Sequence, residues 1–207
     1  MKPGNVFYKF CYCLARAFIG IFYWLKVTGR ENIPAGAAII CANHSSMIDP
    51  FLLAFVCGIN SNIHIISKAE LFRIPVISTI LEWLGMISVD RDTLDIKTIK
   101  KTLGYLKSNE KVVIFPEGTR SSEDNAVTPK IGAVKIAEHA KVAVVPAFIP
   151  RKKPVFRKVN VVVGEPYYIE RPGAKRALEE YATLTNMLMD RIKSLDPAAS
   201  TTAGVGN

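Results

Sequence analysis

The sequence predicts an α/β protein with a mixed, mostly parallel central sheet flanked by helices. Short, continuous apolar runs such as residues 37–42 (AAIICA) and 111–115 (KVVIF) are typical of strands that are buried on both faces of a sheet. Segments with helical periodicity lie between such runs; in residues 93–107 the apolar side chains recur every three or four positions. Strands that alternate with helices favour parallel pairing, and 207 residues suit one domain with a full core.

The expected elements follow one another in regular alternation along the chain. The apolar runs predict strands at residues 37–42, 62–67, 86–89, 111–115, 142–149 and 159–163. The periodic segments predict helices at residues 49–57, 75–84, 93–107, 131–140 and 173–195. Two of these helices carry a proline, Pro50 and Pro75, in the first turn, where proline is tolerated. We therefore expect one domain over residues 29–195 and a small, polar, disordered tail over residues 196–207.

The first 28 residues are rich in aromatic side chains, and Lys9 and Arg16 are among the charges that interrupt them. The longest uncharged stretch, residues 17–25, is far shorter than the ~20 residues that a membrane-spanning helix needs. Apolar side chains recur at three- and four-residue spacing, at Phe10, Leu14, Phe18, Ile21 and Leu25. This pattern predicts an amphipathic helix within residues 1–28 that lies in the membrane interface and anchors a monotopic protein. The alternative is a helix that packs on the protein's own core.

The chain has a net charge of +9, which indicates an anionic partner: a lipid surface, a phosphorylated substrate, an acidic carrier protein or nucleic acid. Nucleic acid is disfavoured, because no recognised binding motif is present and such a module would not explain the apolar N-terminus. Between Glu138 and Glu165 there is no acidic residue, and six basic residues fall there: Lys141, Arg151, Lys152, Lys153, Arg157 and Lys158. This basic run suits anionic lipid headgroups or an acidic carrier protein, with a solvated loop as the alternative.

The four cysteines carry little information about chemistry. Cys11, Cys13, Cys41 and Cys57 lack the spacing of a zinc site, and the N-terminus lacks the cleavage site of a signal peptide. We expect reduced thiols, and a protein associated with the cytoplasmic face of a membrane.

The first candidate site follows the predicted strand at residues 37–42, in residues 43–50 (NHSSMIDP). The ordinary pKa of a histidine side chain is about 6.5, so His44 is suited to take a proton from a hydroxyl group. Asp49 lies five residues on, and a turn between the two residues would let its carboxylate hold the opposite ring nitrogen. The alternatives are a helix N-cap for Asp49 and a hydrogen-bonded turn residue for His44. The intervening serines suit turn and capping positions better than the role of nucleophile.

The second candidate site follows the predicted strand at residues 111–115, in residues 115–121 (FPEGTRS). Gly118 lets the backbone approach a ligand closely, and Arg120 offers a planar fork that suits a phosphate. The alternative is an ordinary β-turn with a solvated arginine. Ligands of open α/β sheets bind at the carboxyl ends of strands, so the two segments are expected to form one pocket.

Four segments in this order resemble a known family. They are residues 43–50, 85–91 (GMISVDR), 115–121 and 144–150 (VVPAFIP). Over about residues 28–170 the chain resembles the lysophosphatidic acid acyltransferases, the glycerolipid acyltransferases with an HxxxxD motif. The resemblance implies transfer of a fatty acyl group from acyl-CoA or acyl carrier protein to the sn-2 hydroxyl of 1-acyl-glycerol-3-phosphate, giving phosphatidic acid. His44 would be the general base and Asp49 its partner.

The resemblance also implies an acceptor-binding site. Its residues would be Glu117, Gly118, Thr119 and Arg120, with Lys68 as a second phosphate contact and Arg91 as a weaker one. An acyl thioester is already activated, so no metal and no cofactor other than this co-substrate is expected. Acylation of a different lysolipid, a thioesterase that uses water as its nucleophile, and a catalytically silent lipid-binding protein are the alternatives.

Overall fold

The computed structural model describes residues 6–73, 78–79, 81–82, 85–89, 96–120, 127–173 and 176–198. Its strands are β1 (Tyr23–Thr28), β2 (Ala38–Ala42), β3 (Ile63–Lys68), β4 (Ile87–Val89), β5 (Lys111–Ile114), β6 (Ala143–Phe148) and β7 (Arg157–Val163). Its α-helices are α1 (Val6–Phe22), α2 (Asp49–Cys57), α4 (Ile96–Lys107), α5 (Gly132–Ala140) and α6 (Leu178–Ser194). Two 3-10 helices, η1 (Arg30–Asn32) and η2 (Ala69–Arg73), follow β1 and β3.

The strands form one seven-stranded sheet in the order β1-β7-β6-β2-β5-β3-β4. Only the pair β6 and β7 is antiparallel among these neighbours, and the other pairs are parallel. The predicted mixed, mostly parallel sheet is therefore confirmed. The five strands from β6 to β4 run in the same direction, so their carboxyl ends share one edge of the sheet.

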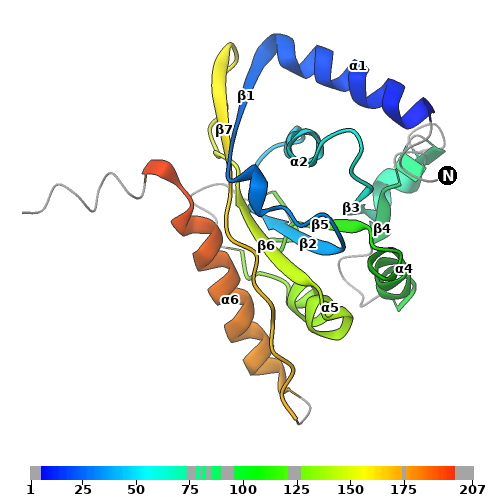
Figure 1. Ribbon diagram of the computed structural model, residues 1–207, viewed down its shortest axis with the longest axis vertical. Helices are drawn as coiled ribbons and strands as arrows, with labels where there is room; N and C mark the ends of the chain where they lie inside the picture. The colour runs from blue at the N-terminus through cyan, green and yellow to red at the C-terminus, as the bar shows by residue number, and fades with distance from the viewer. Residues whose placement is uncertain are drawn as a thin grey trace, which may run out of the picture.

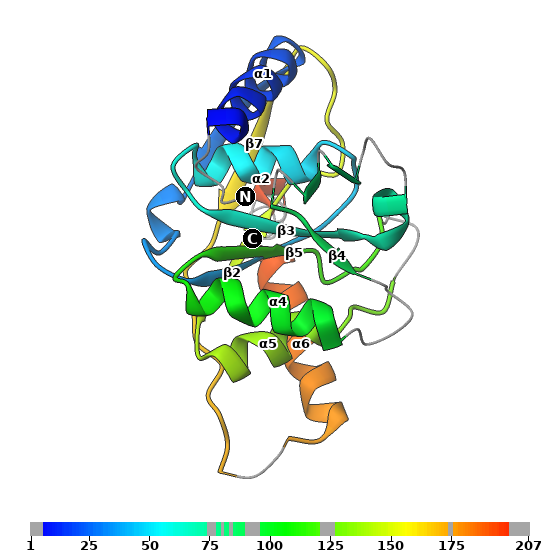
Figure 2. The ribbon, with the colours of Figure 1, turned by 90° about the vertical axis from the view of Figure 1, so that its right-hand side faces the viewer.

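Helices cover both faces of the sheet. Helices α1 and α2 lie on one face, and α4, α5 and α6 lie on the other (Figure 1; Figure 2). Alternate side chains of the central strand β2 enter two separate hydrophobic clusters: Ile40 and Ala42 face α2, and Ile39 and Cys41 face α5 and α6. Burial on both faces explains why β2 is a continuous apolar run rather than an alternating one.

Most of the predicted elements agree with the structure to within a few residues. The predicted helix at residues 75–84, the start of the one at residues 93–107 and the tail after residue 198 lie largely outside the described residues. The last helix begins at Leu178 rather than at residue 173. The backbone N–H of Ala177 donates to the carboxylate of Glu180 at 2.8 Å, which caps the first turn at that point.

The N-terminal segment corrects one prediction. The helix ends at Phe22, and Tyr23–Thr28 form the edge strand β1, paired in parallel with β7 (Figure 1). Exposure alternates along β1, and Leu25 points into the core instead of continuing the outer apolar stripe of the helix. The sheet thus begins before residue 29, where we expected the domain to start. Gly29 ends the strand with φ +75°, and a Cβ atom there would lie 2.0 Å from the Val163 carbonyl oxygen.

Helix α1 has apolar side chains on two sides. Tyr8 and Ile19 are buried against the rest of the protein, where the neighbouring Tyr12 contacts the ring of Phe55 in α2 edge-on. The other side carries exposed apolar residues: Phe10, Leu14, Phe18 and Ile21. The alternative interpretation, a helix that packs on the protein's own core, is therefore correct for one side of α1 only. None of the described helices is long and apolar enough to cross a membrane.

Candidate active site

Three loops at the carboxyl edge of the sheet build the site. They follow the neighbouring strands β6, β2 and β5, and each brings charged side chains to the same place. The loop after β2 carries His44 and leads into α2 at Asp49, the loop after β5 carries Glu117, and the loop after β6 carries two cations. Asn43 ties the first loop to the third, because its side-chain amide donates to the Ile149 carbonyl at 2.7 Å and accepts from the Ile149 N–H at 2.8 Å.

The structure brings His44 and Asp49 together as the sequence predicts. The distance from His44 Nδ1 to Asp49 Oδ2 is 3.1 Å, and the Asp49 side chain is fully buried. The imidazole is 11% exposed and stacks on Phe115, with ring centroids 4.3 Å apart and an interplanar angle of 24°. No residue in the described part of the chain hydrogen-bonds Nε2 of His44. The ring is therefore fixed on one side and open on the other.

Asp49 is held as a carboxylate. Its Oδ2 also accepts the backbone N–H groups of Ser45 and Ser46, both at 2.8 Å. Burial by itself raises the pKa of Asp49, but the hydrogen bond with His44, the Lys153 ammonium and the two N–H groups outweigh burial, so the pKa is lowered. An ionised carboxylate only accepts hydrogen bonds, so Nδ1 of His44 carries the proton that it donates to Asp49. In the neutral imidazole the other nitrogen, Nε2, then has a free electron pair that can take a proton.

Glu117 supports the same histidine from the backbone side. Its carboxylate is 4% exposed; Oε2 accepts the backbone N–H of His44 at 2.9 Å, and Oε1 lies 2.8 Å from Arg151 Nη2. Both oxygens are thus engaged by the protein. Acceptor binding by Glu117 stays a prediction, and the contacts observed give this residue a structural role at His44.

Lys153 is a residue of the site that the sequence did not reveal. Its side chain is 4% exposed, with Nζ 3.0 Å from Asp49 Oδ1 and 2.8 Å from Ser45 Oγ. The contact with Oδ1 is an ion pair rather than a hydrogen bond of regular geometry. In the sequence, Arg151 and Lys153 belong to a basic run that resembles a solvated surface. Their position directly after the fourth motif segment, residues 144–150, was the one available signal.

Those of the remaining predicted residues that the structure describes lie at or near this edge. Gly118 has φ +69° in the turn after β5, and Thr119 and Arg120 are exposed beyond it. Lys68 is the last residue of β3, the strand that neighbours β5; only its backbone is among the described residues. Arg91 lies outside them.

The acidic and sulfur-containing side chains of the site do not form a metal centre among the described residues. Within the described part of the chain, no cluster of three or more His, Cys, Asp or Glu side chains could hold a metal ion. All four cysteines are free thiols, and Cys41 is buried in the core. What the site offers is a base fixed by a carboxylate, with cations nearby.

Comparison with known proteins agrees with this arrangement. A family model described as acyltransferase matches residues 25–150. The 1-acyl-sn-glycerol-3-phosphate acyltransferase of Bacillus subtilis is 34% identical over 91% of this chain and 96% of its own, and that of Borreliella burgdorferi is 30% identical over 89% and 78%. The crystal structure of the 1-acyl-sn-glycerophosphate acyltransferase of Thermotoga maritima superposes with a TM-score of 0.66 and 27% identity, covering 91% of this chain and 79% of that one. The chain is thus an acyltransferase and belongs to the lysophosphatidic acid acyltransferase family.

Proposed function

We propose that this protein transfers a fatty acyl group from an acyl thioester to the free sn-2 hydroxyl of 1-acyl-glycerol-3-phosphate, giving phosphatidic acid. The observation that carries the proposal is the imidazole of His44, fixed at Nδ1 by Asp49 with Nε2 open. A base in this state suits the removal of a proton from an alcohol. The names of the two relatives, which describe acylation of 1-acyl-glycerol-3-phosphate, support the choice of acceptor.

The reaction follows from the chemistry of the two partners. Nε2 of His44 takes the hydroxyl proton as the oxygen forms a bond to the thioester carbonyl carbon. The carbonyl electron pair moves to oxygen and then returns, the C–S bond breaks, and the leaving thiolate takes the proton from the imidazolium. Asp49 stabilises the imidazolium between these steps. The thioester is already activated, so the step requires no metal and no cofactor.

Ser45 and Ser46 have other tasks than nucleophilic attack. Ser45 Oγ accepts a hydrogen bond from Lys153 at 2.8 Å, and both serine N–H groups donate to Asp49. These contacts favour direct transfer over an acyl-serine intermediate. The same N–H groups are unavailable to stabilise the tetrahedral oxyanion.

We place the acceptor phosphate at the exposed turn after β5. Arg120 and Thr119 supply a guanidinium and a hydroxyl there, next to Gly118 with its φ of +69°. Lys68, the last residue of the neighbouring strand β3, is the second phosphate contact that we propose. A carboxylate repels a phosphate, so Glu117 contributes through His44 and Arg151 rather than by direct contact.

Replacing Glu117 with glutamine distinguishes support of His44 and Arg151 from direct binding of the acceptor phosphate. We expect kcat to fall by roughly ten- to a hundredfold, since a neutral amide holds the His44 N–H and Arg151 less strongly. The KM for 1-acyl-glycerol-3-phosphate should stay within about twofold of wild type. The matched variant Arg120→Ala should instead raise KM for the acceptor. Steady-state kinetics measure both constants. A rise of KM without a fall of kcat in Glu117→Gln would show that Glu117 binds the acceptor directly.

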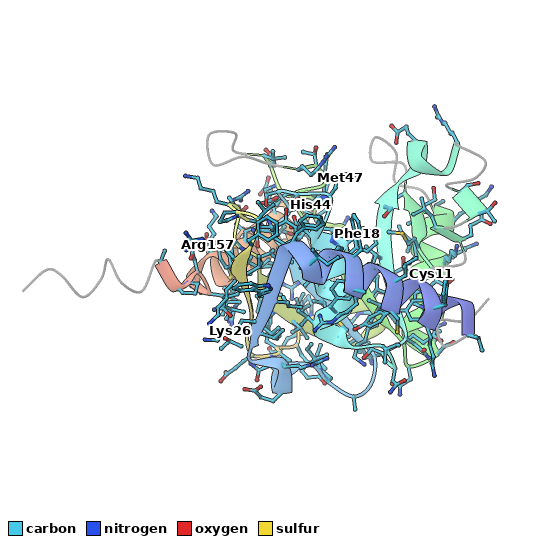
Figure 3. All side chains as sticks on the ribbon, turned by 90° about the horizontal axis from the view of Figure 1, so that it is seen from above. Cys11, Phe18, Lys26, His44, Met47 and Arg157 are labelled. Atoms are coloured by element: carbon cyan, nitrogen blue, oxygen red, sulfur yellow. The ribbon has the colours of Figure 1, made fainter. Side chains whose placement is uncertain are left out.

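The outer side of α1 is the proposed membrane contact. Phe10, Leu14, Phe18 and Ile21 are each at least 60% exposed, and the exposed ring of Phe156 lies 5.8 Å from that of Phe22 at the end of the helix. A contiguous apolar surface of this kind marks an interaction site. Figure 3 looks down on α1 and labels Phe18 on it, with Lys26 and Arg157 on the neighbouring strands β1 and β7. Exposed cations beside an apolar stripe suit a membrane with anionic headgroups.

Phe18→Asp should weaken binding to vesicles of phosphatidylglycerol and phosphatidylcholine by at least about tenfold, because it removes a large apolar group and adds a charge. The matched control is Leu178→Asp, which makes a similar change at a 67% exposed residue of α6 on the other face. This control should bind as wild type does. Vesicle flotation measures both, and equal binding by all three proteins would contradict a membrane contact through α1.

Thiol release in detergent micelles tests the proposed function. The protein is supplied with palmitoyl-CoA or palmitoyl-acyl carrier protein, with and without 1-acyl-glycerol-3-phosphate. Release that depends on the acceptor and yields phosphatidic acid supports the proposal and identifies the donor. Release without an acceptor means a thioesterase, and release only with lysophosphatidylcholine or another lysolipid means a different acceptor.

A further inference from the structure

A buried lysine lies directly behind the catalytic pair. Lys153 and Asp49 have side chains that are 4% and 0% exposed, and Nζ lies 3.0 Å from Asp49 Oδ1. Removing an ammonium group from water is costly, and a surface loop of this composition would ordinarily leave it solvated. Its neighbour Lys152 is exposed, so the inward position of Lys153 is specific to this residue.

The charges around the imidazole of His44 form two ion pairs. Asp49 at Nδ1 is paired with Lys153, and Glu117 at the backbone N–H is paired with Arg151. Both cations come from the short loop after β6, only two residues apart. The neighbouring face of the ring is covered by the uncharged Phe115. These contacts therefore place two negative and two positive groups around the base.

We propose that Lys153 is a positioning residue for acyl transfer, which holds Asp49 and Ser45 in place so that Asp49 keeps hold of Nδ1 of His44 and Nε2 stays open toward the acceptor. The inference rests on the proposed role of His44 as the base. Lys153 does not touch the substrate in this arrangement. It acts on the reaction through Asp49, whose other oxygen holds Nδ1.

Two physical effects follow from the position of the ammonium. First, the ammonium partly neutralises the Asp49 carboxylate, so it reduces the stabilisation that this carboxylate gives to an imidazolium at His44. Second, Nζ bridges Asp49 Oδ1 and Ser45 Oγ, which fixes the turn that presents His44. Removing the charge should therefore make the base protonate more readily, and removing the bridge should loosen its orientation.

The test compares Lys153→Met, Lys153→Gln and Lys153→Arg with the exposed control Lys152→Met. In Lys153→Met we expect the acid limb of the kcat/KM profile to move to higher pH by about one unit. Lys153→Gln keeps a hydrogen-bond donor without the charge, so it should show the same shift even if the methionine variant folds poorly. Lys153→Arg should keep the limb near its wild-type position, and Lys152→Met should leave it unchanged.

Histidine NMR provides a readout that needs no turnover. The protein has three histidines, and His44→Ala assigns the signal of His44. Its titration midpoint should rise in Lys153→Gln and stay in place in Lys153→Arg. An unshifted midpoint in Lys153→Gln overturns the inference even where acyl transfer is confirmed. An absence of transfer by the wild type would overturn the proposed function and leave the midpoint measurement valid.

Discussion

His44→Ala should lower the rate of phosphatidic acid formation by roughly 10²- to 10⁴-fold, the range that a well-placed general base contributes. The expected loss is in kcat, because in the proposed reaction the imidazole acts on the proton of the acceptor rather than on its phosphate. The side chain is nearly buried and stacks on Phe115, so alanine also removes packing. His44→Gln keeps most of this volume but has no basic nitrogen, and it should be about equally inactive.

The other two histidines provide contrasts within the same chain. His64 is buried, with Nδ1 2.7 Å from the Gly85 carbonyl oxygen and Nε2 2.9 Å from Glu110, so neither nitrogen is open to a substrate. His139 is exposed in the last turn of α5, on the opposite face of the sheet. His139→Ala should therefore retain wild-type activity. Thermal unfolding tests whether each variant is folded. A folded His44→Gln enzyme with near-normal kcat would refute the role of His44 as base.

A strand could be predicted from the sequence where it is buried along its whole length. Strand β2 is buried on both faces, so every residue is apolar and the run is visible without knowledge of its neighbours. Strand β5 follows the same pattern after Lys111, with the apolar run Val112, Val113 and Ile114. The edge strand β1 was missed for the opposite reason. It follows α1 without a glycine or proline between them, and its alternating exposure merges with the apolar spacing of the helix. Its pairing with β7, more than 130 residues later, is a tertiary contact that local sequence cannot show.

The site shows the same limit at the level of single residues. His44 and Asp49 are five residues apart, so a local turn is enough to predict their contact. Lys153 reaches Asp49 from more than 100 residues away, and its burial depends on β6 lying next to β2. A lysine in a basic run is normally solvated, so composition alone pointed to the surface. Only the strand order reveals that the loop after β6 lies beside His44 and Asp49.

Asp49→Asn should reduce kcat by roughly 10²- to 10⁴-fold, comparable with the loss of the aspartate in other catalytic pairs of this kind. Oδ2 accepts three hydrogen bonds, so the amide oxygen must take that position and the NH₂ group must face Lys153. The imidazolium then has no counter-charge, and the Lys153 ammonium is buried without an anion. Removing one partner of a buried ion pair typically costs about 3–5 kcal/mol, which urea unfolding would measure.

The double variant Asp49→Asn/Lys153→Met separates catalysis from stability. It removes both charges, so it should regain much of the stability that Asp49→Asn loses while remaining inactive. The pKa of Asp49 is lowered on folding, so its charge stabilises the native state above the ordinary value of 3.8 and ceases to do so as pH falls toward the lowered pKa. The stability difference between wild type and Asp49→Asn should therefore be constant near neutral pH and shrink below pH 3.8. A double variant that transferred acyl groups at the wild-type rate would show that the Asp49 charge serves the fold rather than the reaction.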